Sequence, residues 1–239
     1  MVEPTIILDS IRLFTGILIL VYASYTDIKT RRASNILWLI MGSIGAILLL
    51  VQYLIIGFEN LIYLIFIPVM IGLVYLLFQL RLIFGGADAK ALMAIAILVP
   101  IEPIINQFPI WKETPMPFSW SIFANSIIIF LFIPISLLVF NLIKGNLKFP
   151  YALLGYKMNI NNARDKFVWP LEQFIDGKRK FVYMPKDFDV SEEYDEFEKH
   201  NINEIWVTPK IPFMIPLLIG YIFAFIFGDI LYYFMNSIM

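Results

Sequence analysis

Two aspartates at the edges of apolar segments are the side chains of this chain best suited to chemistry. Asp27 ends a first apolar run, and Asp88 stands between the apolar runs Leu61 to Leu80 and Ala91 to Ile101. A carboxylate beside hydrocarbon costs on the order of several kcal/mol unless it is paired or wetted, so such an acid points to a functional site. If the two approach each other, they can hold one proton between them. One carboxylate could then activate a water molecule while the other donates to a scissile carbonyl, as in aspartic proteases.

A plainer interpretation stays open, in which Asp27 and Asp88 neutralise Arg32 and Lys90 in an interfacial layer of charge. Other chemistries are excluded by composition: the chain has no cysteine, and its single histidine, His200, lies in the most polar segment. These counts remove Cys/His dyads, a Ser/His pair within the membrane and zinc sites that need several histidines. A net charge of -1 gives no field for nucleic acid. We expect no metal, nucleotide or organic cofactor.

The elements that must position the two acids are membrane-spanning helices. The chain has 239 residues, is 60% hydrophobic and has a mean hydropathy of +0.79. Windows of about twenty apolar residues mark spanning helices. Six are predicted, at residues 5–27, 34–56, 61–83, 88–101, 119–143 and 211–236. The first is expected to be a retained span rather than a removable signal peptide, because it carries Asp9 and Arg12 and lacks a small-residue cleavage site.

Basic residues in the short connections predict the orientation. Arg31 and Arg32 follow the first span, Arg81 and Lys90 border the turn between the third and fourth, and Lys144 follows the fifth. Because cytoplasmic loops carry the excess of Lys and Arg, these three connections are expected in the cytoplasm and both termini outside. The two aspartates then share one depth, at the cytoplasmic edge of the cell membrane.

Three regions are expected. Residues 1–144 would hold five transmembrane helices and both aspartates, residues 145–210 a small cytoplasmic α+β insert, and residues 211–239 the sixth helix. In the insert, Asp176-Gly177 between β-like runs predicts a hairpin, Ser191 opens a predicted helix to about Lys199, and residues 204–208 predict a last strand.

An acidic run and two opposite charges in the first span are further candidates. Glu192, Glu193, Asp195, Glu196 and Glu198 form either a solvated helix face or a patch that meets a basic peptide. Asp9 and Arg12 are three residues apart and can pair along the first span. Structural neutralisation is favoured there over a transport role.

Three motifs resemble those of one family. They are the segment from Asp27 to Asn35, Gly85-x-Ala87-Asp88-x-Lys90 opening the fourth span, and Ile211 to Pro216 opening the sixth. Together they resemble the type IV prepilin peptidase family of GxGD membrane aspartyl proteases, and most closely the archaeal preflagellin peptidases.

The resemblance implies that Asp27 and Asp88 are the catalytic pair. Gly85, Gly86, Ala87 and Lys90 would belong to the motif around Asp88, and Pro212 and Phe213 would position substrate. Pro212 could equally just start a helix, and Lys90 is favoured to reach toward the interface rather than tune the acids. Ala87 replaces the second glycine of the family pattern and could narrow the approach to the backbone. The cysteine-bearing segment linked with N-methylation is absent, so only cleavage is expected.

The function expected from these features is removal of short basic signal peptides from preflagellins or pilin-like precursors. Its partners would be those precursors and membrane lipid. The alternative is a proton- or cation-coupled transporter that uses Asp27, Asp88 and the Asp9/Arg12 pair as a relay. A transporter should place its polar sites near the bilayer midplane, whereas both acids are expected at one face. A non-catalytic scaffold gives no reason for the motif around Asp88.

Overall fold

The computed structural model describes residues 3–58, 61–80, 82–83, 85–111, 114–175, 177–183 and 191–238. Arg81 and Asp176 lie outside these residues. The chain divides into two compact units, one formed by Met1–Phe130 with Pro212–Met239 and the other by Leu131–Ile211.

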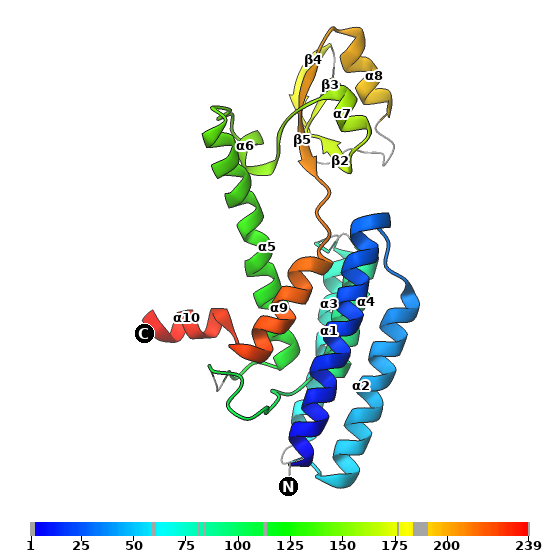
Figure 1. The fold of residues 1–239 in the computed structure, drawn as a ribbon, viewed down its shortest axis with the longest axis vertical. Coiled ribbons are helices and arrows are strands. Elements are labelled where there is room, and N and C mark those ends of the chain that lie inside the picture. The colour runs from blue at the N-terminus through cyan, green and yellow to red at the C-terminus, as the bar shows by residue number, and fades with distance from the viewer. Residues whose placement is uncertain are drawn as a thin grey trace. The chain divides into compact units, whose positions relative to one another are not determined.

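The first unit is helical. Its elements are α1 (Pro4–Thr30), α2 (Asn35–Ile55), the 3-10 helix η1 (Leu61–Ile65), α3 (Phe66–Gln79), α4 (Gly86–Leu98), the first half of α5 (Phe118–Ile143), α9 (Met214–Ile226) and α10 (Ile230–Ile238) (Figure 1). Local signals set several ends. Arg31 ends α1 in the left-handed region, with φ 55°, and its N–H donates to the Asp27 carbonyl. The Ser34 side chain accepts from the N–H of Ile36 at the start of α2.

Among the residues that the structure describes, four segments are long and apolar enough to cross a membrane, namely α1, α2, Leu61–Gln79 and α5. A fifth is obtained if α9 and α10, which are bent by 57° at the break between them, count as one span. The chain is therefore a multi-pass membrane protein. Of the six expected spans, the one at 88–101 corresponds to α4, which has 13 residues. It is shorter than the roughly 20 residues that a span needs.

The helix α4 is enclosed by protein. It packs against α2 and α3, and Ala91, Leu92, Ile95 and Leu98 along it are at most 1% exposed. Gly45 on α2 allows the closest approach, because a Cβ there would lie 2.6 Å from the Cα of Leu98. A helix that is apolar on all sides is one that other elements surround. The helix that carries Asp88 is therefore held by its neighbours, mainly α2 and α3.

Polar contacts fasten the end of α1 that lies away from Asp27. Asp9 and Arg12 form a buried ion pair of 2.5 Å, which confirms the predicted pairing. Arg12 also donates to the side chain of Gln52 (2.7 Å), and Asp9 accepts from the N–H of Ile104 (2.8 Å). The Tyr221 hydroxyl donates to the Arg12 carbonyl at 2.7 Å. The two charges are therefore paired within the protein, as structural neutralisation requires, although Nε of Arg12 has no hydrogen-bond partner among the described residues.

The break between α9 and α10 has a local cause. Gly228 has φ 103°, and a Cβ there would lie 2.4 Å from the carbonyl oxygen of Trp111. Asp229 then accepts from the N–H of Tyr232 and from the hydroxyl of Ser121, at 2.9 and 2.8 Å. The expected helix at 211–236 is therefore interrupted at a position whose backbone conformation and close packing favour glycine. The next side chain, Asp229, caps α10.

The second unit is a small α+β structure. It contains the end of α5, α6 (Tyr151–Leu154), β1 (Tyr156–Asn159), α7 (Ile160–Arg164), β2 (Val168–Pro170), β3 (Glu172–Ile175), β4 (Lys178–Phe181), α8 (Ser191–Lys199) and β5 (Glu204–Pro209). The strands form an antiparallel sheet in the order β1-β5-β2 and a separate β3-β4 hairpin. Phe197 of α8 packs with Ile205 and Val207 of β5 in one buried cluster. The predicted hairpin, helix and last strand are confirmed.

Candidate active site

Asp88 lies in the first turn of α4, and its carboxylate folds back over the residue that precedes the helix. A Cβ added to Gly85 would lie 2.1 Å from Oδ2 of Asp88 and 2.7 Å from its Cγ. Gly85 has φ −87° and ψ 115°, an ordinary extended conformation. Glycine is therefore required here for space rather than for backbone freedom. In the first turn of a helix the exposed backbone N–H groups favour a negative charge.

Asp27 lies in the last turn of α1. Its backbone carbonyl accepts from the N–H of Arg31 at 3.0 Å, in the turn that ends the helix, and its side chain is half-buried. The two carboxylates are close enough for the charge of Asp27 to act on Asp88, and the charge of Arg31 acts on Asp27. The structure thus brings the C-terminal end of α1 and the N-terminal end of α4 together.

Lys90 ties the start of α4 to the start of α2. Its Nζ donates to Oδ1 of Asn35 at 2.8 Å. The side chain is exposed, and Asn35 is the first residue of α2. Sequence analysis gave Lys90 a place at the interface but gave Asn35 no contact. Asn35 was named only as the last residue of the motif from Asp27 to Asn35.

Gly86 and Ala87 are less constrained than Gly85. A Cβ on Gly86 would meet the Phe78 ring at 3.8 Å, which is ordinary van der Waals contact. The methyl group of Ala87 is partly buried and packs against the core of the first unit.

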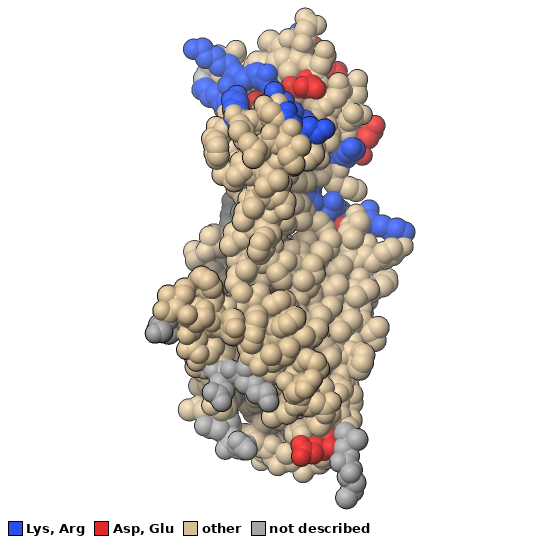
Figure 2. Space-filling view, turned by 60° about the vertical axis from the view of Figure 1, so that its left-hand side comes forward, with Lys and Arg blue, Asp and Glu red and all other residues tan. Residues whose placement is uncertain are grey.

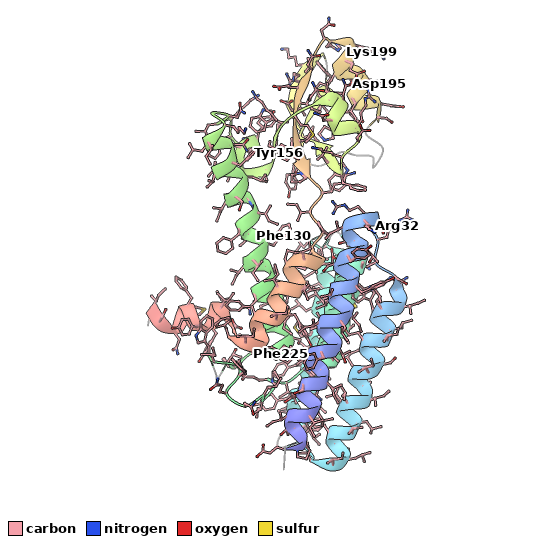
Figure 3. The ribbon with its side chains drawn as sticks, in the orientation of Figure 1. Arg32, Phe130, Tyr156, Asp195, Lys199 and Phe225 are labelled. Atoms are coloured by element: carbon pink, nitrogen blue, oxygen red, sulfur yellow. The ribbon has the colours of Figure 1, made fainter. Side chains whose placement is uncertain are left out.

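Pro212 and Phe213 stand at the start of α9. The Pro212 carbonyl accepts from Ile215, and Phe213 occupies the position before the first helical residue. The ring of Phe213 meets that of Phe130 edge to face, with centroids 5.8 Å apart. Figure 3 marks the position of Phe130 on α5. These contacts fit a role in starting and anchoring α9.

The acidic run lies on α8 in the second unit, where Tyr194 and Phe197 face the core. Three of its five acids make contacts within the unit. Glu193 accepts from Gln173 at 2.9 Å. Arg164 contacts Asp195 at 2.5 Å and Glu198 at 3.3 Å, and the hydrogen bond to Asp195 raises the pKa of the guanidinium. Glu192 is exposed and Glu196 is half-buried.

What this site can do chemically follows from the pair of acids. Two half-buried carboxylates within electrostatic reach favour a state in which one is protonated and the other is ionised. Such a pair can accept a proton from water and donate one to a substrate oxygen. Gly85 leaves the room that the Asp88 carboxylate occupies.

Comparison with known proteins identifies the family of the chain. The model of the type IV leader peptidase family matches residues 14–140, and that of the archaeal peptidase A24 C-terminus, type II, matches residues 147–230. The chain therefore belongs to the type IV leader peptidase family.

Within that family, its relatives include archaeal preflagellin peptidases. Those of Methanococcus voltae and Methanococcus maripaludis are 31% and 28% identical to it, over 90% of this chain and 94% of each relative. The preflagellin peptidase of Methanocaldococcus jannaschii is 27% identical, over 92% of this chain and 94% of the relative.

Proposed function

We propose that this protein is an intramembrane aspartic endopeptidase that removes the short basic signal peptide from preflagellins or prepilin-like precursors. The observation that carries the proposal is the approach of Asp27 and Asp88, from different helices, to within reach of each other's charge. The substrate class comes from the names of the relatives. Membership of a peptidase family favours this function over the transporter.

The mechanism needs only the two acids and a water molecule. The ionised carboxylate takes a proton from the water molecule as the water oxygen attacks the scissile carbonyl carbon. The protonated carboxylic acid gives its proton to the carbonyl oxygen. The tetrahedral intermediate then collapses as the C–N bond breaks. The acid that took the proton from water gives it to the leaving amine. The other carboxylate takes back the proton of a diol hydroxyl as the carbonyl re-forms, which restores the pair to one proton.

The membrane arrangement is part of the proposal. The N-terminal end of α4 and the C-terminal end of α1 lie at the cytoplasmic face, since Lys29, Arg31 and Arg32 directly follow Asp27 and its helix. The helix α4 is too short to span a bilayer, but it is embedded because protein surrounds it. A precursor would keep its basic segment in the cytoplasm and its apolar segment in the bilayer, with the scissile bond at the depth of the acids.

Substitution of the acids tests the catalytic pair. Asp27→Asn and Asp88→Asn each keep the side-chain shape but remove the acid, and each is expected to abolish cleavage of a precursor with a basic signal segment. Asp9→Asn, at the other end of α1, is the control and should retain cleavage per folded molecule. Purified variants are incubated with the precursor and the shortened product is followed on gels. Wild-type cleavage by either of the first two variants would defeat the proposed mechanism.

A second experiment tests the acidic run as a substrate contact. Glu192→Gln with Glu196→Gln removes two charges without disturbing the contacts that Glu193, Asp195 and Glu198 make within the unit. If α8 meets the basic segment, KM for the precursor rises about two- to tenfold while kcat stays unchanged, the range expected for exposed charge pairs. An unchanged KM assigns the run to a solvated helix face.

A further inference from the structure

The second unit contains a pocket at the point where α5 ends. Its volume is about 370 Å³, within the range of about 300–1,000 Å³ typical of small-molecule sites. One wall is the segment 145–148, which directly follows α5. The other walls come from the sheet and the hairpin, with Lys157 of β1, Arg179 of β4, and Glu204 and Trp206 of β5.

One acid of the pocket is already neutralised. Glu172 is 1% exposed, and its carboxylate is ion-paired with Arg179 and accepts from the N–H of Trp206 at 3.3 Å. The guanidinium of Arg179 itself remains partly exposed. Glu204 is the other acid of the lining, facing the cations Lys148, Lys157 and Arg179. The pocket therefore carries an excess of positive charge.

Among the described residues, aromatic rings rather than carboxylates contact the two lysines. Nζ of Lys148 lies 4.5 Å from the centre of the Tyr151 ring, and Nζ of Lys157 lies 5.9 Å from that of Trp206. A ring attracts an ammonium group but leaves its net charge uncompensated. Both side chains can therefore present a full positive charge to an anion in the pocket.

The frame of the pocket is rigid where it meets α5. The side-chain amide of Asn141, near the end of α5, donates to the carbonyls of Ala152 (3.0 Å) and Gly155 (2.6 Å). Gly155 lies so close to β5 that a Cβ there would be 2.0 Å from the carbonyl oxygen of Val207. These contacts fix α6 and the sheet to the end of the helix.

The surroundings of the pocket are those of a membrane interface. The helix α5 is a candidate span that ends at Ile143, and the pocket lining begins two residues later. Beside it, Ile143 is 79% exposed, Leu147 53% and Phe149 65%. Exposed apolar side chains next to lysines, directly after a span, are typical of segments at the depth of lipid headgroups. Figure 2 shows basic side chains gathered on one side of this unit.

We propose that this pocket binds the phosphate-bearing headgroup of an anionic membrane lipid. The ammonium groups of Lys148 and Lys157 would contact the phosphate oxygens, with the guanidinium of Arg179 at the back. Ile143, Leu147 and Phe149 would lie against the upper part of the acyl chains. The bound lipid would hold the start of the second unit at the membrane surface. This role is independent of the cleavage chemistry.

The experiment measures lipid binding by the full chain in detergent. Thermal unfolding is followed while short-chain phosphatidylglycerol, phosphatidylcholine or inorganic phosphate is added. The proposal expects a saturable rise in Tm with phosphatidylglycerol and little with phosphatidylcholine. Lys148→Gln with Lys157→Gln is expected to weaken the binding about thirty-fold, since each basic residue near anionic lipid contributes about fivefold. Lys166→Gln with Lys199→Gln, two exposed lysines of the same unit, is the matched control.

Each outcome decides the assignment. Weaker binding in the pocket variant alone, with partial competition by millimolar inorganic phosphate, supports a headgroup site. Equal weakening in both double variants would mean non-specific attraction and would overturn it. If inorganic phosphate stabilises the protein as strongly as the lipid does at equal concentration, the ligand is free phosphate and the lipid assignment is wrong. A pocket variant that is folded but binds phosphatidylglycerol as wild type does also overturns it.

Discussion

Replacing Gly85 by alanine is the sharpest test of how the structure holds Asp88. The added methyl group would lie 2.1 Å from Oδ2 of Asp88, whereas ordinary contact begins near 3.4 Å, so the carboxylate must move by about 1.3 Å. The obstacle is the end of a side chain, so the fold can adapt by rotating Asp88. The chain should remain folded with its carboxylate displaced.

The substitution is expected to lower the rate of precursor cleavage rather than the stability of the protein. Misplacement of a catalytic group by about 1 Å can lower the rate about a hundredfold. Gly85→Ala is therefore expected to reduce kcat for precursor cleavage by about that factor, with Tm within a few degrees of the wild type. The assay is cleavage of a precursor with a basic signal segment in detergent, paired with thermal unfolding of the same samples.

Gly86→Ala is the matched control. It adds the same methyl group one residue later, where the nearest neighbour is the Phe78 ring at 3.8 Å, and this variant should cleave at close to the wild-type rate. If Gly85→Ala also cleaved at the wild-type rate, the contact between Gly85 and the Asp88 carboxylate would have no part in placing the acid.

Two further predictions concern stability. Gly45→Ala places a Cβ within 2.6 Å of the Leu98 backbone and should lower the free energy of unfolding by about 1–3 kcal/mol. Gly42→Ala, the control, makes only a 3.7 Å contact and should leave Tm unchanged. Equal Tm values for the two variants would mean that α2 and α4 are not tightly packed. Arg12→Met leaves the buried Asp9 carboxylate without its partner and should cost about 3–5 kcal/mol. Adding Asp9→Asn to Arg12→Met should recover part of that loss in thermal unfolding, and a double variant no more stable than the single would contradict this account.

Sequence patterns predicted the long helices well, because a helix that spans a membrane needs an apolar segment of a defined length. The runs predicted at 5–27 and 119–143 appear as Pro4–Thr30 and Phe118–Ile143. In the second unit, the two-residue turn before Lys178 was predicted from the Asp-Gly signal, and Ile175 pairs with Lys178 as such a hairpin requires.

Hydropathy could not predict the enclosure of α4 or the break before α10. The enclosure depends on the small size of Gly45 and its approach to Leu98, a contact between residues far apart in the chain. The break depends on Gly228 fitting against Trp111, which is equally remote in sequence. Both are properties of packing rather than of composition.

The two acids of the candidate site were predicted from the sequence, but the residues that contact and position them were not. The pattern singled out Asp27 and Asp88 because charge beside hydrocarbon is rare. The hydrogen bond between the side chains of Lys90 and Asn35 joins two helices. A single contact of this kind produces no periodic pattern in the sequence. The reason for Gly85 was likewise hidden, since its backbone conformation is one that any residue adopts.

The enclosure of α4 has a consequence for how the protein responds to different lipids. Helices that face lipid tilt or shift when the bilayer thickness changes, and here α1, α2 and α5 have the length to do so. The helix α4 has few lipid-facing side chains, so its depth is set by its protein neighbours. Hydrophobic mismatch would therefore reach Asp88 only through those neighbours, whereas Asp27 lies in the last turn of α1 and would move with that helix.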